Sequence, residues 1–182
     1  MVTANFEHSM PAGFKDEPWI GDRFAETGVL VLGESWYGDW GAEHNSDKGY
    51  VQAYLDGLLA DAMYTRMANA CGQSREMFWH QVMFTNFVIW AGALRTHRPT
   101  THMYLDAYVR LERLIEQYRP KGVWLLGKGQ AEFSSHVLMR MGIPFEVTPH
   151  PTSYGVKNEV LKESWMALQG KISTPSQLAP AA

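Results

Sequence analysis

Three polar segments, each in or beside a short apolar run, contain side chains that suit catalysis or ligand binding. Glu34 follows the first run, and its carboxylate can act as a base, orient a water molecule or stabilise a cation. Asn86 lies in the second run, and its amide presents an acceptor and donors side by side, which suits the edge of a pyrimidine or an amide. His150 stands between two prolines, which stiffen the backbone and pre-organise the imidazole as a donor.

Neighbouring residues supply further groups for contact with a ligand. Tyr37 offers a flat ring that can stack on a planar ligand, and Gly33 is expected to let the backbone turn sharply off the preceding run. With Asn86, the candidate substrate-binding residues are Gly33, Ser35, Trp36, Tyr37, Pro151, Ser153 and Tyr154. Each segment also has a purely structural interpretation: a polar turn with packed aromatic rings, an Asn that braces loop backbone, and a surface turn around the His.

Short apolar runs are typical of strands that are covered on both faces, as in a parallel sheet. They span residues 28–33, 82–89, which Thr85 and Asn86 interrupt, and 122–127, and residues 145–147 predict a fourth short strand. Apolar residues at helical spacing predict helices over 49–70, over 101–118, from Phe133 to Met141 and from about 158 to 168. This alternation predicts an α/β protein, a three-layer α/β/α sandwich around a four-stranded parallel sheet.

The predicted topology brings the polar segments together. Right-handed crossovers place the carboxyl ends of all four strands at one edge of the sheet, where ligands of open α/β sheets bind. We therefore expect one pocket at that edge, lined by Glu34, Tyr37, Asn86 and His150. Residues 34–49 are polar and rich in glycine and are expected to form a long loop, and loops of that length are often functional.

The composition indicates one folded domain. The chain has 182 residues, of which 46% are hydrophobic and 19% are charged, which is enough for a core and argues against intrinsic disorder. We expect residues 1–172 to form a single domain with an irregular lead-in over 1–27. Residues 173–182 are expected to form a flexible tail, because they are rich in Pro, Ala and Ser.

The sequence argues against several kinds of site and location. Cys71 is the only cysteine, which excludes an internal disulfide and an iron–sulfur cluster held by several thiolates. The seven histidines show no compact metal-ligand spacing, so we expect no metal and no cofactor. No apolar run approaches the length of a membrane span, and the N-terminus lacks the pattern of a secretory signal. A cytoplasmic protein without a membrane partner is the simplest expectation.

The charged residues are unevenly distributed along the chain. The net charge is −3, but residues 1–61 hold three basic and eleven acidic side chains, whereas residues 62–182 hold thirteen basic and eight acidic ones. Such asymmetry can leave a basic face on an acidic protein, although a mixed solvated surface explains it equally well. If nucleic acid binds, we expect Arg95, Arg98 and Lys157 to gather at the pocket mouth.

Five segments of the chain resemble, in order and spacing, motifs of the uracil-DNA glycosylase-like superfamily. They read VLVLGESWYG (29–38), FWHQVMFTNFV (78–88), RPT (98–100), GVWLLGKG (122–129) and HPTSYG (150–155). The first is similar to that of a poorly characterised branch whose motif reads GESHYG. The resemblance spans roughly residues 18–165 and implies a four-stranded parallel sheet flanked by helices. It also implies a monomer that acts on DNA or binds a free base or nucleotide.

The resemblance implies a role for each candidate residue in cleaving an N-glycosidic bond, as in base excision during DNA repair. Glu34 would position water and favour the sugar cation, and Tyr37 would stack on the base. Asn86 would read the edge of the base, and His150 would donate to the oxygen of the departing base. Tyr154 corresponds to the wedge that stacks where a base has left the helix. The target nucleotide would be flipped out or single-stranded.

Two alternative functions stay open at this point. Trp36 stands where many related sequences have His, so a possible catalytic donor is missing, which favours a non-catalytic module that binds a base, nucleotide or nucleic acid. A small esterase-like hydrolase would instead use Ser35 as nucleophile and His150 as its base. Such enzymes usually place an Asp three residues before the His, where this chain has Val147, with Glu146 one residue further back.

Overall fold

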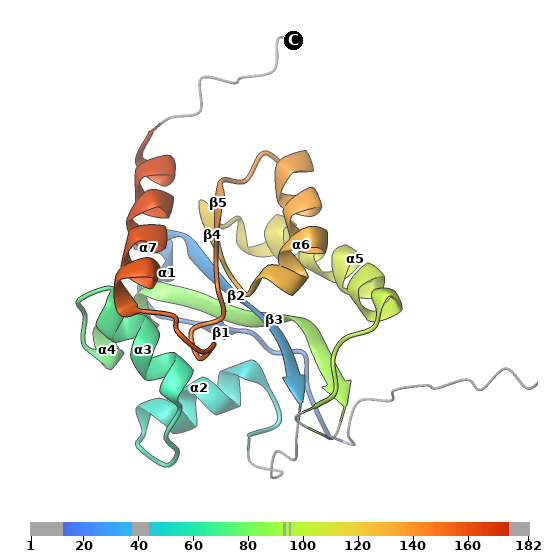
Figure 1. Ribbon diagram of the computed structural model, residues 1–182, viewed down its shortest axis with the longest axis horizontal. Helices are drawn as coiled ribbons and strands as arrows, with labels where there is room; N and C mark the ends of the chain where they lie inside the picture. Colours follow the sequence, from blue (N-terminus) through green and yellow to red (C-terminus); the bar gives the residue numbers. More distant parts are fainter. Residues whose placement is uncertain (1–12, 38–43, 93, 95, 175–182) are drawn as a thin grey trace, which may run out of the picture.

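A five-stranded β-sheet with the strand order β1-β3-β2-β4-β5 runs through the centre of the computed structural model, which describes residues 13–37, 44–92, 94 and 96–174 (Figure 1). The strands are β1 (Trp19–Ile20), β2 (Val29–Tyr37), β3 (Val82–Gly92), β4 (Gly122–Leu126) and β5 (Phe145–Thr148). Strands β2 to β5 run parallel to one another, and β1 pairs antiparallel with β3. The four expected strands are therefore parallel, but the sheet as a whole is mixed, because the lead-in adds an edge strand.

The central strands are apolar on both faces. Residues 29–32 of β2 and 123–126 of β4 are fully buried, as expected for continuous apolar runs in a parallel sheet. Successive side chains of a strand point to opposite faces. Val29 and Val31 therefore join one apolar cluster, and Leu30 joins the other.

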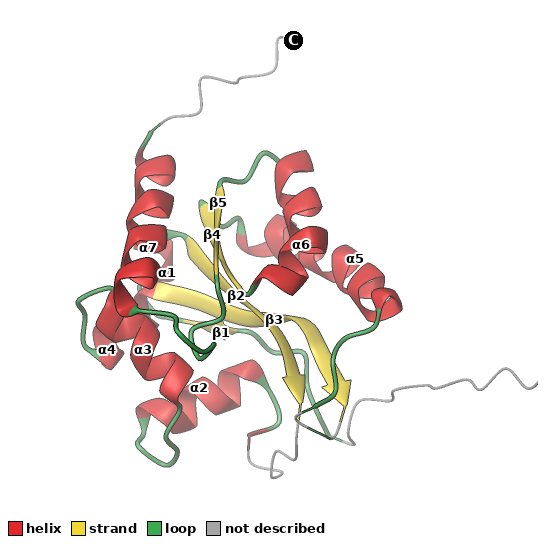
Figure 2. Ribbon diagram, viewed as in Figure 1, coloured by secondary structure: helices red, strands yellow, loops and turns green. Residues whose placement is uncertain are grey.

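Helices cover both faces of the sheet (Figure 2). One apolar cluster joins a face of the sheet to α2 (Asp47–Leu55), α3 (Ala62–Ala70), α4 (Arg75–Gln81) and α7 (Asn158–Ser173). The second cluster joins the other face to α1 (Phe24–Thr27), α5 (Thr101–Tyr118) and α6 (Lys128–Arg140). None of the helices in the described part of the chain is long and apolar enough to cross a membrane.

Both ends of the described chain are more regular than expected. The lead-in over 1–27 contributes β1 and the single turn α1. Trp19 helps to hold β1, because its indole N–H donates to the backbone carbonyl of Trp79 at 2.7 Å. Helix α7 continues to Ser173, well past its expected end, and residues 175–182 of the expected tail lie outside the described residues.

The predicted single helix over 49–70 is wrong, because the structure has two helices there. Helix α2 ends before Gly57, which adopts the left-handed φ of 75°. Helix α3 starts after Asp61, whose carboxylate accepts from the backbone N–H of Tyr64 at 3.0 Å and so caps the helix. The apolar spacing continues across the turn between the helices and therefore hides it. Helix α4 was also not predicted.

The predicted loop over 34–49 is shorter than expected. Strand β2 extends to Tyr37, and α2 already begins at Asp47. The segment between them includes residues 38–43, which lie outside the described residues. The candidate residues 33–37 therefore belong to a strand that is hydrogen-bonded to β3, not to a loop.

Candidate functional site

A cavity of about 410 Å³ lies where the carboxyl-terminal parts of β2 and β3 meet the segment after β5. Its volume falls in the usual range of small-molecule sites, roughly 300–1,000 Å³. Glu34, Tyr37, Asn86 and His150 all line it. Three further candidates also line it: Gly33, Ser35 and Trp36. The structure thus brings together the residues that were expected to meet, while their chemical roles stay predictions.

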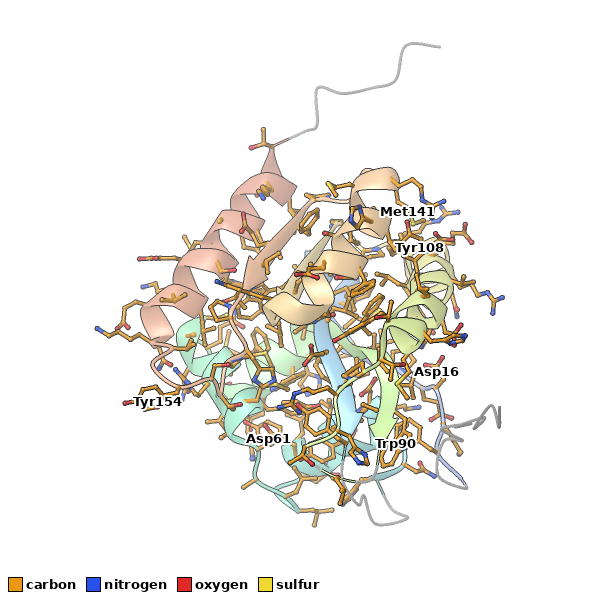
Figure 3. The ribbon with its side chains drawn as sticks, turned by 45° about the vertical axis from the view of Figure 1, so that its right-hand side comes forward. Asp16, Asp61, Trp90, Tyr108, Met141 and Tyr154 are labelled. Atoms are coloured by element: carbon orange, nitrogen blue, oxygen red, sulfur yellow. The ribbon has the colours of Figure 1, made fainter. Side chains whose placement is uncertain are left out.

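Three candidates of the last segment do not line the cavity. Tyr154 is fully exposed and projects outward from the molecule (Figure 3). The cavity lining instead includes Asp61, which precedes α3. Pro151 is buried behind the loop, and Ser153 is exposed and donates its backbone N–H to the carbonyl of His150 at 2.9 Å. These residues shape the loop that carries the imidazole, and the fully exposed ring of Tyr154 is placed to meet a partner outside the cavity.

Gly33 serves the site through its small size and not through an unusual backbone conformation. Its φ lies outside the left-handed region, and β2 continues beyond it, so the expected sharp turn is wrong. A Cβ atom on Gly33 would lie 2.3 Å from Oδ1 of Asn86, far inside van der Waals contact. Glycine therefore leaves the space in which the amide of Asn86 lies.

A buried carboxylate fixes the orientation of the Asn86 amide. Asp47 at the start of α2 accepts from Nδ2 of Asn86 at 2.9 Å, from its backbone N–H at 3.1 Å and from the hydroxyl of Thr85 at 2.6 Å. The indole N–H of Trp36 also donates to Asp47. A carboxylate can only accept hydrogen bonds, so Nδ2 of Asn86 must face Asp47. Oδ1 of Asn86 therefore lies over Gly33 in the cavity wall.

The same carboxylate accounts for the indole of Trp36, at the position where the resemblance predicts a His. Burial raises the pKa of Asp47, and the hydrogen bonds from Thr85, Trp36 and Asn86 oppose this rise. The indole therefore helps to keep the acceptor in place, and its ring packs edge-on against Tyr50 at a centroid distance of 4.7 Å. Trp36 thus supports the position of Asn86.

Arg110 of α5 extends this network away from the cavity. Its guanidinium donates to the backbone carbonyl of Asn86 and to the hydroxyl of Thr85, both at 2.8 Å. It is also paired with Asp16, which precedes β1. Segments from the N-terminal part of the chain, β3 and α5 are therefore tied together directly behind the amide.

Glu34 is held by two elements. Its Oε1 accepts from the hydroxyl of Tyr104 at 2.9 Å. The same oxygen lies against the first turn of α6, where a Cβ on Gly129 would be only 2.6 Å away. Burial and the neighbouring Glu34 raise the pKa of Tyr104, so its phenol stays a neutral donor. The glycine-rich segment around Gly129, which does not match a phosphate loop, therefore allows Glu34 a close approach.

His150 faces the cavity as a neutral imidazole. Its Nδ1 lies 3.3 Å from the backbone N–H donor of Thr152 and 3.0 Å from the hydroxyl of the same residue. Because Nδ1 accepts from the backbone, the ring proton is assigned to Nε2. Desolvation lowers the pKa of His150, assisted by Arg98 and opposed by Glu34 and Asp61. The ring is therefore a donor without a positive charge.

Arg66 of α3 holds the segment that carries His150. Its guanidinium donates to the backbone carbonyl of Val156 at 2.6 Å and to the side-chain oxygen of Asn158 at 3.1 Å. It also donates to the carbonyl of Pro151. One cation therefore joins both ends of this segment, which limits how far the imidazole can move.

The expected basic rim is found only in part. Arg98 lies over the ring of Tyr37, with its guanidinium carbon 5.5 Å from the ring centroid. Lys157 is exposed at the start of α7 and does not line the cavity. Arg95 lies outside the described residues.

The contacts that an esterase triad needs are not found among the described residues. The hydroxyl of Ser35 is buried and has no hydrogen-bond partner, so it is not activated by His150. Nδ1 of His150 faces Thr152 instead of a carboxylate. Glu146, the nearest acid in sequence to the expected position, is paired with Lys171 at 2.7 Å. The geometry therefore disfavours acyl transfer through Ser35.

The acidic and phenolic residues of the site that the sequence analysis missed include Asp47, Asp61 and Tyr64. Asp61 carried a recognisable signal, because Asp directly before an apolar helical pattern is typical of an N-cap. Asp47 and Tyr64 lie on helical segments whose rotation over the sheet edge is set by tertiary packing. Local spacing alone does not give that rotation.

No three His, Cys, Asp or Glu side chains are placed to hold a metal ion together within the described ranges.

Two comparisons with known proteins address the ancestry of the chain. No protein-family model matches the sequence, and no curated protein matches it either. The case for a function therefore rests on the geometry of the cavity and on the resemblance of the ordered motifs.

Proposed function

We propose that this protein binds a flipped-out or single-stranded modified base and hydrolyses its N-glycosidic bond. The observation that supports this proposal is the meeting, in one cavity, of a carboxylate (Glu34), an amide with a fixed orientation (Asn86) and a neutral imidazole donor (His150). Four parallel strands with helices on both faces are also what a uracil-DNA glycosylase-like fold requires, and we assign the chain to that fold as part of the same proposal.

The cavity groups match the charges that develop in this reaction. As the bond between the sugar C1′ and the base nitrogen breaks, its electron pair moves to the base and the sugar gains oxocarbenium character. Glu34 favours that cation and orients the water that adds to C1′. His150 donates from Nε2 to the base oxygen on which negative charge accumulates. The water proton then neutralises the released base.

The remaining groups suit recognition of the base and of its strand. Asn86 presents Oδ1 and its second amide hydrogen to the edge of the base, and Tyr37 offers a ring for stacking. The exposed ring of Tyr154 lies on the loop that carries His150, where a wedge would fill the gap left by a flipped base. We therefore propose DNA as the partner of this face.

Single-turnover release of base from oligonucleotides tests the proposal. The substrates carry uracil, hypoxanthine, xanthine or a hydroxymethylated pyrimidine, in single and double strands. We expect release of at least one base, and we expect His150→Ala to lower the rate by roughly 10²–10³ with little change in substrate affinity. His136→Ala is the matched control, because this His is exposed on α6 outside the cavity.

The result also separates the enzyme from the binding module. If no base is released from any substrate while a base or nucleotide still binds in the cavity, the non-catalytic module is the better account. Glu34→Gln adds a second criterion, because it keeps the shape of the side chain and removes the charge that favours the sugar cation. Rates unchanged by both variants would refute the assigned roles.

A further inference from the structure

Two hydroxyl groups in the cavity wall are buried and have no hydrogen-bond partner among the described residues. They are the phenol of Tyr64 on α3 and the hydroxyl of Ser35 on β2. Tyr64 is 0% exposed and Ser35 is 8% exposed. Buried polar groups in folded proteins almost always have a partner, because an unpaired group loses its hydrogen bonds to water without replacement. Because both groups belong to residues that line one cavity, a ligand that enters it can supply the partner.

The phenol of Tyr64 cannot turn away to find a partner of its own. Its ring packs against Trp79, Phe84 and Tyr50, with centroid distances of 4.4, 5.2 and 5.6 Å. Its backbone N–H is held by the capping carboxylate of Asp61 at 3.0 Å. A phenylalanine would keep all of these contacts, so packing does not explain why a hydroxyl is present.

The surroundings indicate which ligand atoms these hydroxyls suit. Burial and the nearby Asp47 and Asp61 raise the pKa of Tyr64 well above its ordinary value, so the phenol is neutral and offers one donor and one acceptor. The described lining includes the carboxylates of Glu34 and Asp61 but neither Lys nor Arg. An anionic group is therefore repelled, whereas a carbonyl, an N–H or a hydroxyl group is accepted.

We propose that Tyr64 and Ser35 contact the ligand and bind neutral polar substituents of the base, so that the site prefers bases with carbonyl, amino or hydroxymethyl groups over bases with a methyl group in their place. This inference rests on the proposed function, because it takes the ligand to be a base. It adds Tyr64, on a helix outside the resembling motifs, as a specificity-determining residue.

Titration of free bases into the full-length protein tests the inference, together with thermal unfolding of the same samples. The probes are uracil, thymine, 5-hydroxymethyluracil, hypoxanthine and xanthine. We expect Tyr64→Phe to weaken binding of the preferred base about five- to tenfold while the melting temperature is unchanged or higher. Ser35→Ala should act in the same direction and provides a second, smaller change at the same wall.

Tyr54→Phe is the matched control. Tyr54 is also a buried tyrosine of the same aromatic cluster, but its hydroxyl is bonded to that of Thr65 at 2.9 Å, and it does not line the cavity. Its variant should lose stability and keep the wild-type affinity. Tyr64→Phe should therefore weaken binding without loss of stability, whereas Tyr54→Phe should lose stability without weaker binding.

The outcomes separate this inference from the proposed reaction. Wild-type affinity for every base in both Tyr64→Phe and Ser35→Ala would overturn the inference and leave the reaction standing. Weaker binding in the variants without base release from oligonucleotides would support the inference and count against the reaction. A wild-type protein that binds none of the five bases would overturn both.

Discussion

The imidazole of His150 is neutral because of its surroundings and not only because of its own chemistry. The backbone N–H of Thr152 occupies Nδ1, and burial disfavours the charged ring. Protonation of Nδ1 would remove the hydrogen bond from Thr152 and place a cation in a partly buried site. The fold therefore selects the Nε2–H tautomer, which is the one that can donate to a base oxygen.

This arrangement predicts a dependence of stability on pH. The pKa of His150 lies below its ordinary value of 6.5 in the folded state, so below pH 6.5 the unfolded chain binds this proton more readily than the folded chain. The free energy of unfolding should be unaffected by this group above pH 6.5 and should fall as the pH drops through 6.5. Urea denaturation of the wild type and of His150→Ala across this range measures the difference.

The variant should show a shallower loss of stability on acidification than the wild type. His136→Ala again serves as the control, because this exposed side chain has no role in the loop, and it should keep the wild-type slope. Equal slopes in all three proteins would contradict a lowered pKa for His150.

Asp47 has the largest number of contacts of any acidic side chain at the site, and its replacement should be costly. Asp47→Asn places a donor against one of the groups that now donate to the carboxylate, and the Asn86 amide loses its fixed orientation. We expect a loss of about 1–3 kcal/mol in the free energy of unfolding. Binding of the preferred base should weaken, and selectivity between bases should fall.

Asp56→Asn is the control for this change. Asp56 is exposed after α2 and accepts a hydrogen bond from Gln52 at 2.9 Å. Its variant should leave both stability and selectivity near those of the wild type. If Asp47→Asn loses stability but keeps full selectivity, the carboxylate supports the fold and does not orient the amide.

At the scale of the elements, the close approach of β2 and β3 at Gly33 makes a third prediction. Gly33→Ala suits the strand conformation, but its methyl group would lie 2.3 Å from Oδ1 of Asn86, which Asp47 holds in place. We expect a loss of about 1–3 kcal/mol in stability, as for other overpacked sites, and weaker binding of the base.

A double-mutant cycle identifies the cause. In the background of Asn86→Ala the amide is absent, so Gly33→Ala should cost much less stability than it does in the wild type. Additive losses would show that the methyl group collides with something other than the amide.

The elements that were predicted correctly are those whose pattern is local. Short runs rich in apolar residues predict β2 to β5, and helical spacing predicts α5 with the observed bounds, 101–118. Strand β1 has only two residues, Trp19 and Ile20, which are too few to show an alternation, and it is held by a long-range bond to Trp79. The break between α2 and α3 depends on the conformation of Gly57, which the apolar spacing does not reveal.

The residues of the candidate site also divide into those that a local sequence pattern predicts and those that depend on tertiary packing. Glu34 lies within β2, Asn86 lies within β3 opposite Gly33, and His150 follows β5, so the register of the parallel strands brings them together. Asp47 and Tyr64 reach that edge from helices, and their positions depend on how α2 and α3 pack over the sheet. Sequence patterns therefore predict the polar groups that line the cavity but not most of those that hold them or close the cavity.

For the whole molecule, some of the basic side chains of residues 62–182 form hydrogen bonds within the fold. Arg110 is only 14% exposed and serves the network behind Asn86, and Arg66 holds the loop of His150. The cavity wall itself is acidic, through Glu34 and Asp61. If nucleic acid is the partner, we expect its phosphates to contact the rim, where Arg98 lies over Tyr37.

This distribution predicts a small but measurable salt dependence of oligonucleotide binding. If the partner is nucleic acid, the logarithm of the association constant should fall linearly with the logarithm of the salt concentration, because bound cations are released from the phosphates. Arg98→Gln should reduce the slope by about one, whereas Arg113→Gln, an exposed change on α5, should leave it unchanged. Fluorescence anisotropy of a labelled single strand over a series of salt concentrations measures both slopes. An affinity that does not respond to salt, in the wild type as in Arg98→Gln, would instead identify a free base or another small neutral ligand as the molecule that the cavity binds.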